Sequence, residues 1–231
     1  MPAEDRLQRG PAPAEDEIYE YITRGIVSKS IRPGSRIREA ALAERFNVGR
    51  ARVRRVLRRL AELDVIEFRL NRGACVSLPL PAESRAVFQT RRVLEAEAVR
   101  GAARLRDNDA ISNLETFVQR EIIAHSKRRS GLTAFSSGFH TMVADMCGNP
   151  VLAKILKQLV HRCVLIQALY ERQSARTICL VDEHAEIARM IREGRAKDAV
   201  VAMDRHIDHI EDSLDYSKAE LMDDASPAPV A

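Results

Sequence analysis

The sequence predicts a mainly α-helical protein in two parts: a small basic N-terminal domain with a β-hairpin and a larger helical C-terminal domain. Three observations support this fold class. In most of the 231 residues, apolar side chains recur with the spacing of one helix face. A stiff Pro79-Leu80-Pro81 segment divides the chain. Residues 1–80 hold 16 Lys and Arg against 11 Asp and Glu, whereas the remainder holds 21 against 22, so the basic excess lies in the N-terminal part.

The composition excludes several other classes of protein. Hydrophobic residues make up 45% of the chain, enough to bury a core, whereas aromatic residues make up 4% and Trp is absent. The low aromatic content argues against a stacking platform for single-stranded nucleic acid. No signal peptide is recognised and no apolar run is long enough for a membrane span, so we expect no membrane partner. The cysteines form no CxxC pair, which predicts a reduced, cytoplasmic chain: Cys75, Cys147, Cys163 and Cys179.

One helix in the N-terminal part is exceptionally basic. Six of the eleven residues of Arg50–Leu60 are arginine, and none is acidic. Its apolar residues, Val53, Val56, Leu57 and Leu60, follow the i, i+3, i+4, i+7 pattern of a buried helix face. Such a charge run is typical of a solvated helix, or of a helix beside double-stranded DNA, which carries one charge per roughly 1.7 Å of its axis.

The neighbouring segments favour the DNA-binding interpretation. Two short turns with glycine stand out: Asn47-Val48-Gly49 before the basic helix, and Asn71-Arg72-Gly73 at the tip of a hairpin. The other predicted elements are a helix from Asp16 with Ile18, Tyr21, Ile22, Gly25 and Ile26 on one face, a strand over Ser35–Arg38, a helix over Glu39–Phe46, a strand in which the apolar residues Ile66, Phe68 and Leu70 alternate, and a strand over Cys75–Leu78. A helix-turn-helix followed by a basic-tipped hairpin is a winged helix-turn-helix, whose second helix enters a major groove.

These motifs resemble the DNA-binding domain of the GntR family of bacterial transcription regulators. The matching residues are Pro33-Gly34, Leu42-Ala43-Glu44, Phe46, Val48, Arg50, Val53-Arg54, Leu57, Leu60 and Asn71-Arg72-Gly73 with Val76. The resemblance implies a double-stranded DNA operator as partner. We expect groove contacts from Arg50, Arg52 and Arg54 and wing contacts from Asn71, Arg72 and Gly73.

The basic helix departs from the family pattern in two respects. Gly49 stands where the family usually has Ser or Thr, so the helix lacks a side-chain cap and a phosphate-contacting hydroxyl. Arg52 and Arg55 stand where small or acidic residues are common. We expect these two arginines to strengthen non-specific DNA binding.

The C-terminal half resembles the helical effector domain of the FadR-type subfamily of GntR regulators. Its motifs are Arg91-Arg92-Val93-Leu94-Glu95, Phe139-His140, Gly148-Asn149-Pro150, Glu183-His184 and His206-Ile207. Six helices are predicted, as in the branch named after vanillate-responsive regulators: Ser84–Asp107, Asp109–Lys127, Thr133–Met146, Val151–Glu171, Ser174–Glu193 and Arg195–Tyr216.

The predicted fold is therefore mainly α, with an N-terminal winged helix-turn-helix joined to a C-terminal six-helix antiparallel bundle. The predicted segments are a disordered arm over 1–15, the winged helix-turn-helix over 16–78, a linker over 79–83, the effector-binding and dimerisation domain over 84–216, and a loose tail over 217–231.

Three histidines in the helical half are candidate metal ligands. His140, His184 and His206 lie on different predicted helices, but spacing alone, without an HExxH signature, more often marks unconnected structural histidines. The resemblance implies a divalent metal, which we expect to be zinc, bound by these three residues. The family's Asp, four residues before the first histidine, is replaced by Ser136, whose hydroxyl is a poorer ligand. Binding by three histidines alone, a substitute ligand and loss of the metal all remain open.

The effector is expected to be a small carboxylate or another anion. The candidate contacts are Arg91, Arg92 and Asn149, and the resemblance favours Arg91. The structural alternatives are solvated arginines and an Asn149 that only caps a helix. His209, one turn from His206, is a possible substitute metal ligand.

The sequence thus predicts a ligand-responsive transcription regulator rather than an enzyme. We expect a homodimeric repressor of a catabolic operon that leaves a palindromic operator when an anionic metabolite binds the helical domain. Two alternatives are a metal-dependent hydrolase in the helical domain and an effector-independent architectural DNA binder. No carboxylate stands at an obvious general-base spacing, which argues against the hydrolase.

Overall fold

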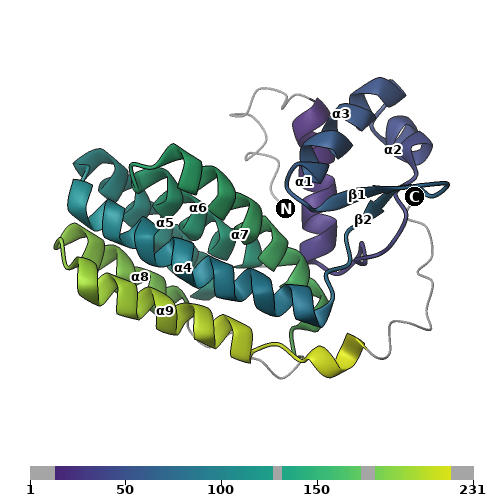
Figure 1. Ribbon diagram of the computed structural model, residues 1–231. Helices are drawn as coiled ribbons and strands as arrows, with labels where there is room; N and C mark the ends of the chain where they lie inside the picture. The colour runs from purple at the N-terminus through teal and green to yellow at the C-terminus, as the bar shows by residue number, and fades with distance from the viewer. Residues whose placement is uncertain (1–13, 127–131, 173–179, 220–231) are drawn as a thin grey trace. The chain divides into compact units, whose positions relative to one another are not determined.

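The computed structural model describes residues 14–126, 132–172 and 180–219, and it is mainly α-helical, as predicted (Figure 1). The chain divides between Ser77 and Leu78 into two compact units. Some predicted features lie outside the described residues: the arm over 1–13, the tail from 220, Cys179 and the start of the fifth bundle helix at Ser174.

The N-terminal unit contains three helices and one hairpin: α1 (Ala14–Val27), α2 (Glu39–Arg45), α3 (Arg50–Ala61), β1 (Ile66–Arg69) and β2 (Gly73–Val76). The strands pair antiparallel, with Ile66 opposite Val76 and Arg69 opposite Gly73. The helix-turn-helix with a following wing is therefore present. The connection from α2 to α3 passes through Asn47, whose φ of 50° lies in the left-handed region that Asn tolerates better than most residues.

The core of this unit forms where α1 and α3 pack together. The predicted inward faces are confirmed, since α1 buries Ile18, Ile22, Gly25 and Ile26, and α3 buries Val53, Val56, Leu57 and Leu60. Gly25 is required by close packing, because a Cβ there would lie 2.5 Å from Cδ1 of Ile31.

The small sheet differs from the prediction in two details. The segment expected as a strand over Ser35–Arg38 makes only an isolated bridge, between Arg36 and Cys75. In β1 only Ile66 is buried, whereas Phe68 is 50% exposed and Leu70 is 91% exposed. The hairpin extends beyond the core toward its tip, so alternation along β1 does not place the later residues on a covered face.

The C-terminal unit contains six α-helices among its described residues: α4 (Pro81–Leu105), α5 (Asn108–Ser126), α6 (Leu132–Met146), α7 (Pro150–Tyr170), α8 (Leu180–Arg192) and α9 (Ala196–Asp212), followed by the 3₁₀ helix η2 (Tyr216–Ala219). Helix α4 packs against α6, α7, α8 and α9, while α5 packs against α6 and α8 (Figure 1). The predicted six-helix bundle is confirmed.

Its boundaries differ from the prediction at both ends. Helix α4 begins at Pro81, inside the predicted linker, because proline is well suited to the first position of a helix. The last helix ends at Asp212 rather than Tyr216, since Leu214 forms a bridge with Glu171 instead. Val93, an apolar residue of the motif at Arg91–Glu95, is 68% exposed.

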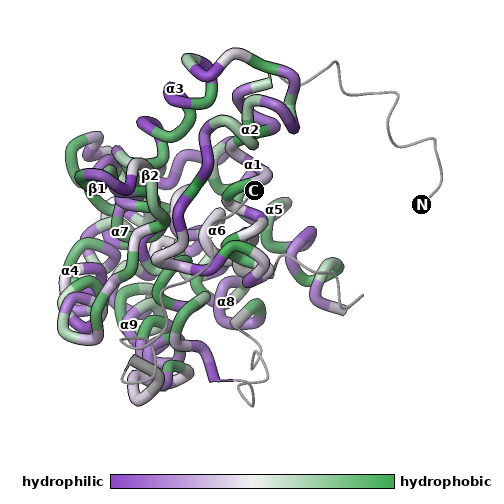
Figure 2. Tube along the Cα trace, turned by 90° about the vertical axis from the view of Figure 1, so that its right-hand side faces the viewer, coloured by the Kyte–Doolittle hydropathy of each residue, from purple (hydrophilic) through white to green (hydrophobic). Residues whose placement is uncertain are grey.

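Hydrophobic and hydrophilic residues alternate along the helices, as expected for elements that bury one face (Figure 2). Among the described residues, no helix is both long enough and apolar enough to cross a membrane.

Candidate metal centre and nucleic-acid interface

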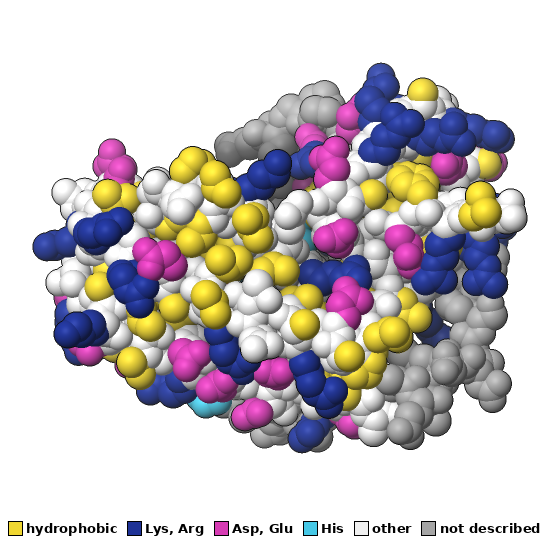
Figure 3. Space-filling model, viewed as in Figure 1, with side chains coloured by type: hydrophobic (Ala, Val, Ile, Leu, Met, Phe, Trp, Pro, Cys, Tyr) yellow, Lys and Arg dark blue, Asp and Glu magenta, His cyan; other side chains and the backbone are white. Residues whose placement is uncertain are grey.

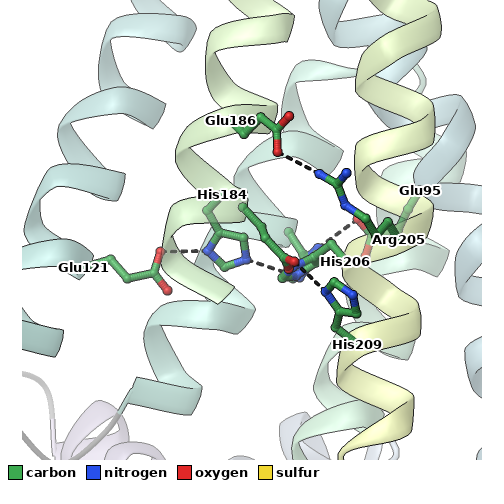
Figure 4. Close-up of polar contacts among 9 residues, drawn as sticks. Glu95, Glu121, His184, Glu186, Arg205, His206 and His209 are labelled. Atoms are coloured by element: carbon green, nitrogen blue, oxygen red, sulfur yellow. Dashed lines mark hydrogen bonds and ion pairs between the residues drawn. The ribbon is translucent and has the colours of Figure 1, made fainter. Parts of the chain in front are cut away.

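His140 of α6, His184 of α8 and His206 of α9 meet inside the helical unit, and all three side chains are buried. The Nε2 atoms of His184 and His206 are 3.1 Å apart, and those of His206 and His140 are 3.2 Å apart. Figure 4 shows His184 and His206 directed toward one another from neighbouring helices. The three histidines are 22 to 66 residues apart in sequence, and each directs its Nε2 atom toward the others.

The other nitrogen of each ring contacts a carboxylate. All three Nδ1-to-oxygen distances are 2.8 Å: His140 with Glu95 of α4, His184 with Glu121 of α5, and His206 with Glu183 of α8. A Nδ1–H that donates to a carboxylate fixes the ring orientation and leaves the Nε2 lone pair free, which is the usual support of a metal-binding histidine.

The electrostatics of the cluster keep the rings neutral. Burial lowers the pKa of His184 to about 3 and that of His206 to about 4, and it lowers the pKa of His140 well below its ordinary value. Burial also raises the pKa of Glu121 to about 7. Burial alone would raise the pKa of Glu183, but hydrogen bonds from His206 and His209 hold it below its usual value. Neutral imidazoles are the form that binds metal.

The residues present fit a divalent metal. Two Zn–N bonds of about 2.0–2.1 Å at the tetrahedral angle place their nitrogens about 3.3 Å apart, close to both measured Nε2 distances. The three carboxylates together with the buried guanidinium of Arg91 carry a net charge of −2 when ionised, which one divalent cation would neutralise. Ser136 lies in α6, and its side chain is outside the described part of the structure.

Arg91, the favoured candidate for an effector contact, lies in the hydrogen-bond network of this cluster. Its side chain is 2% exposed, and its Nε donates to Glu95 Oε1 at 2.6 Å, while the other oxygen of Glu95 contacts His140. Among the described residues, its Nη2 is buried without a hydrogen-bond partner. A buried guanidinium N–H without an acceptor is costly, so an anion that reached it would be stabilised.

The other two candidate effector contacts are engaged elsewhere. Arg92 lies toward α9 and pairs with Asp208 at 2.5 Å and Glu211 at 2.7 Å. The Oδ1 of Asn149 accepts from the backbone N–H groups of Val151 and Leu152, so this exposed residue caps α7. The structure therefore brings neither side chain to the histidine cluster, and an effector role for either stays a prediction.

His209 is not a substitute for His206, because it is exposed and contacts Glu183 from the outer side of the cluster (Figure 4). Glu121, in contrast, was not predicted from the sequence as part of the site. It lies three residues after Val118 and seven after Leu114, so it continues the buried stripe of α5. A carboxylate at such a position is the signal that could have identified it.

The arginines expected to contact DNA lie on the exposed surface of α3. Arg50, Arg52 and Arg54 are all exposed, while Gly49 precedes the helix without a side-chain cap, as expected. Figure 3 shows Lys and Arg side chains gathered over the part of the N-terminal unit where Figure 1 places α3. A helix turns about 100° per residue, so Arg50 and Arg54 share a side, whereas Arg52 lies on the other flank of the exposed face.

The wing tip has the backbone that its residues permit. Asn71 and Gly73 have positive φ values of 60° and 73°, and Arg72 between them is exposed. A Cβ on Gly73 would meet no atom within 4 Å, so glycine is favoured there by the backbone angle rather than by lack of space. The hairpin therefore holds one arginine at its outer end.

Comparisons with known proteins match both halves of the chain. The model for bacterial regulatory proteins of the gntR family matches residues 14–76, and the FCD domain model matches residues 86–209. The HTH-type transcriptional regulator YdfH of Escherichia coli O6:H1 is 26% identical over 225 residues, covering 96% of this chain and 98% of that protein. The HTH-type transcriptional repressor RspR of Escherichia coli K12 is 25% identical over 213 residues, covering 91% and 93%.

Solved structures show the same fold. The structure of McbR/YncC from E. coli superposes with a TM-score of 0.70 at 14% identity, covering 85% of this chain and 94% of that one. The structure of a GntR regulator from Rhodococcus sp. RHA1 gives a TM-score of 0.66 at 18% identity, covering 91% and 98%. The chain therefore belongs to the GntR family of bacterial transcription regulators, in the branch that carries an FCD domain.

Proposed function

We propose that this regulator is a homodimeric repressor that binds a palindromic operator and is released by a small carboxylate or another anionic metabolite. The observation that carries the proposal is the buried histidine cluster with the unpaired Nη2 of Arg91 in the same network. A family match alone would leave open whether this chain has retained a site for a ligand.

In the N-terminal unit, α3 is assigned to the major groove and the hairpin to the adjacent backbone and minor groove. Arg50 and Arg54 share the side of α3 that reads guanine edges, and Arg72, held by Asn71 and Gly73, contacts the minor groove. Arg52 is left out of base contact because it lies on the other flank of the helix.

In the helical unit, His140, His184 and His206 would hold a divalent metal, which we assign as zinc because three neutral imidazoles suit it. Such a metal would supply a Lewis acid for an anionic oxygen. The Nη2–H of Arg91 would donate to the anion, while Glu95 orients both Arg91 and His140. Repression is supported by the relative RspR, which is named a repressor.

The DNA-binding half is tested with the full-length chain and a fluorescent fragment of its own promoter. Each guanine contact contributes about 1–3 kcal/mol, so Arg50→Ala with Arg54→Ala should weaken specific binding by at least about 30-fold. The control, Arg104→Ala with Arg120→Ala, removes the same charge from exposed positions of the helical unit. If the α3 double variant bound the promoter as tightly as the control, α3 would not be the reading element.

The sensing half is tested by elemental analysis and by release from DNA. The purified chain should contain about one zinc per protomer, and His184→Ala with His206→Ala should contain none. A panel of small carboxylates should release the zinc-loaded chain from its promoter more readily than chelated chain or Arg91→Ala. Equal release in all three would refute a site formed by the metal and Arg91.

A further inference from the structure

The six arginines of α3 form two stripes. Arg50, Arg54 and Arg58 follow one another at intervals of four residues, and Arg52, Arg55 and Arg59 follow at intervals of three and four. At about 100° per residue, the centres of these stripes are roughly 130° apart on the exposed face of the helix. We name them the reading stripe (Arg50, Arg54, Arg58) and the outer stripe (Arg52, Arg55, Arg59).

The whole outer stripe is held by two acidic residues at the start of α1. Oε1 of Glu15 is 2.6 Å from Nη2 and 3.0 Å from Nε of Arg55, and 3.9 Å from Nε of Arg52. Oδ1 of Asp16 is 3.2 Å from Nη1 of Arg59. The guanidinium of Arg59 also lies over the ring of Tyr19, 4.4 Å from its centre.

The reading stripe is largely free by comparison. Arg54 pairs with Glu39 of α2 at 2.8 Å, while Arg50 and Arg58 have no acidic partner among the residues that the structure describes. The two stripes therefore differ in how many of their positive charges are available to a phosphate.

Exposed ion pairs of this kind add little to folding stability, because solvent screens them and the side chains lose conformational entropy. Their effect on DNA binding is larger. A DNA phosphate that approaches the outer stripe must displace a carboxylate from the guanidinium group to which it is paired. A carboxylate that stays in place repels the phosphate. Each cation withheld in this way removes one phosphate contact from sequence-independent binding.

We propose that Glu15 and Asp16 are specificity-determining residues of this regulator. By holding the outer stripe, they suppress binding to the phosphates of arbitrary sequences and leave operator recognition to the reading stripe. This rests on the proposed role of α3 in DNA binding. It also revises the expectation from the sequence that Arg52 and Arg55 strengthen non-specific binding, because both guanidinium groups pair with Glu15.

The test measures the binding of full-length chain to a random-sequence duplex and to the promoter fragment across a salt series. Glu15→Gln with Asp16→Asn should steepen the slope of log K against log salt on random DNA by about 1 to 3, at about 0.9 for each phosphate gained. The ratio of promoter affinity to random-sequence affinity should fall. The matched control is Glu17→Gln with Glu20→Gln, which changes the net charge equally on the same helix without touching an α3 arginine.

Adding Arg55→Gln and Arg59→Gln to the first variant should restore most of the original slope, because only Arg52 of the outer stripe then remains without its acidic partner. In the unmodified chain the same arginine pair should leave the slope almost unchanged, which keeps the test informative if loss of the acidic residues disturbs α1. An unchanged slope in the acidic-residue variant, an equal change in the control, or a slope reduced by about 2 when the arginines alone are replaced would each overturn the inference. Failure of the proposed DNA-reading role would appear separately, as full promoter binding by Arg50→Ala with Arg54→Ala.

Discussion

Replacing Glu121 with glutamine should weaken metal binding without weakening the metal-free fold. The carboxylate is buried and contacts Nδ1 of His184 at 2.8 Å from the opposite side of the ring to the metal-facing Nε2. Loss of such a partner typically costs 10- to 100-fold in metal affinity, or about 1.4–2.7 kcal/mol. At saturating zinc, the same amount disappears from the unfolding free energy, and the midpoint temperature should fall by about 3–11 °C.

The metal-free chain should respond differently to the same change. Without a cation, the buried cluster holds more negative than positive charge, and burial already raises the pKa of Glu121 to about 7. Glu121→Gln removes one of the excess negative charges, so the chelated variant should unfold at or above the temperature of the chelated wild type. Opposite responses with and without zinc separate a role in metal binding from a general packing defect.

The assay is competition for zinc against a coloured chelator, together with thermal unfolding with and without zinc. Glu115→Gln is the matched control, because Glu115 lies on the same helix, is more exposed and pairs with Arg192 at the surface. The reasoning would be refuted by an unchanged zinc affinity in Glu121→Gln, or by an equal loss of affinity in Glu115→Gln.

Three further predictions concern pH, packing and metal removal. In the metal-free chain, His184 and His206 take up protons below about pH 6.5 when unfolded, but only near their folded pKa values of about 3 and 4 when folded. These two residues therefore lower the free energy of unfolding as the pH falls below 6.5. His140, whose pKa is also lowered, adds to this loss, whereas the raised pKa values of Glu121 (about 7) and Glu95 oppose it. The lowered histidines outnumber the raised carboxyls, so urea unfolding should show a net loss of stability between pH 6.5 and 4.5; a flat profile would contradict the shifts. Gly101→Ala should destabilise the helical unit by about 1–3 kcal/mol in urea, because its Cβ would overlap the carbonyl oxygen of Cys147, and unchanged stability would show that α4 yields there. Chelation should lower the midpoint temperature and added zinc should restore it, whereas a chain that unfolds identically in both conditions has no linked metal site.

Elements with a periodic pattern of apolar residues could be predicted from the sequence. The buried face of α3 followed directly from Val53, Val56, Leu57 and Leu60, because helical spacing is a local property. The burial of a residue that depends on neighbours distant in sequence could not be predicted. Val93 has the apolar character of a core residue, but no other element of the described chain covers it, and it is exposed.

The candidate site was also predicted only in part. Its three histidines and Arg91 were identified through short family motifs, Arg91 from its place four residues before Glu95. Their partners were not, since Glu121 contacts a histidine 63 residues away and only the packing of α5 on α8 brings the two together. The pairing of Glu15 with Arg55, 40 residues away, is equally invisible in the linear sequence.

The carboxylate supports of the three histidines reach across the helical unit. Through these carboxylates and the rings, one point joins α4, α5, α6, α8 and α9, and only four residues separate the end of β2 from the start of α4. An ion held at that point would therefore be linked to all five of these helices at once, and its loss would remove a shared contact of all five rather than of one helix.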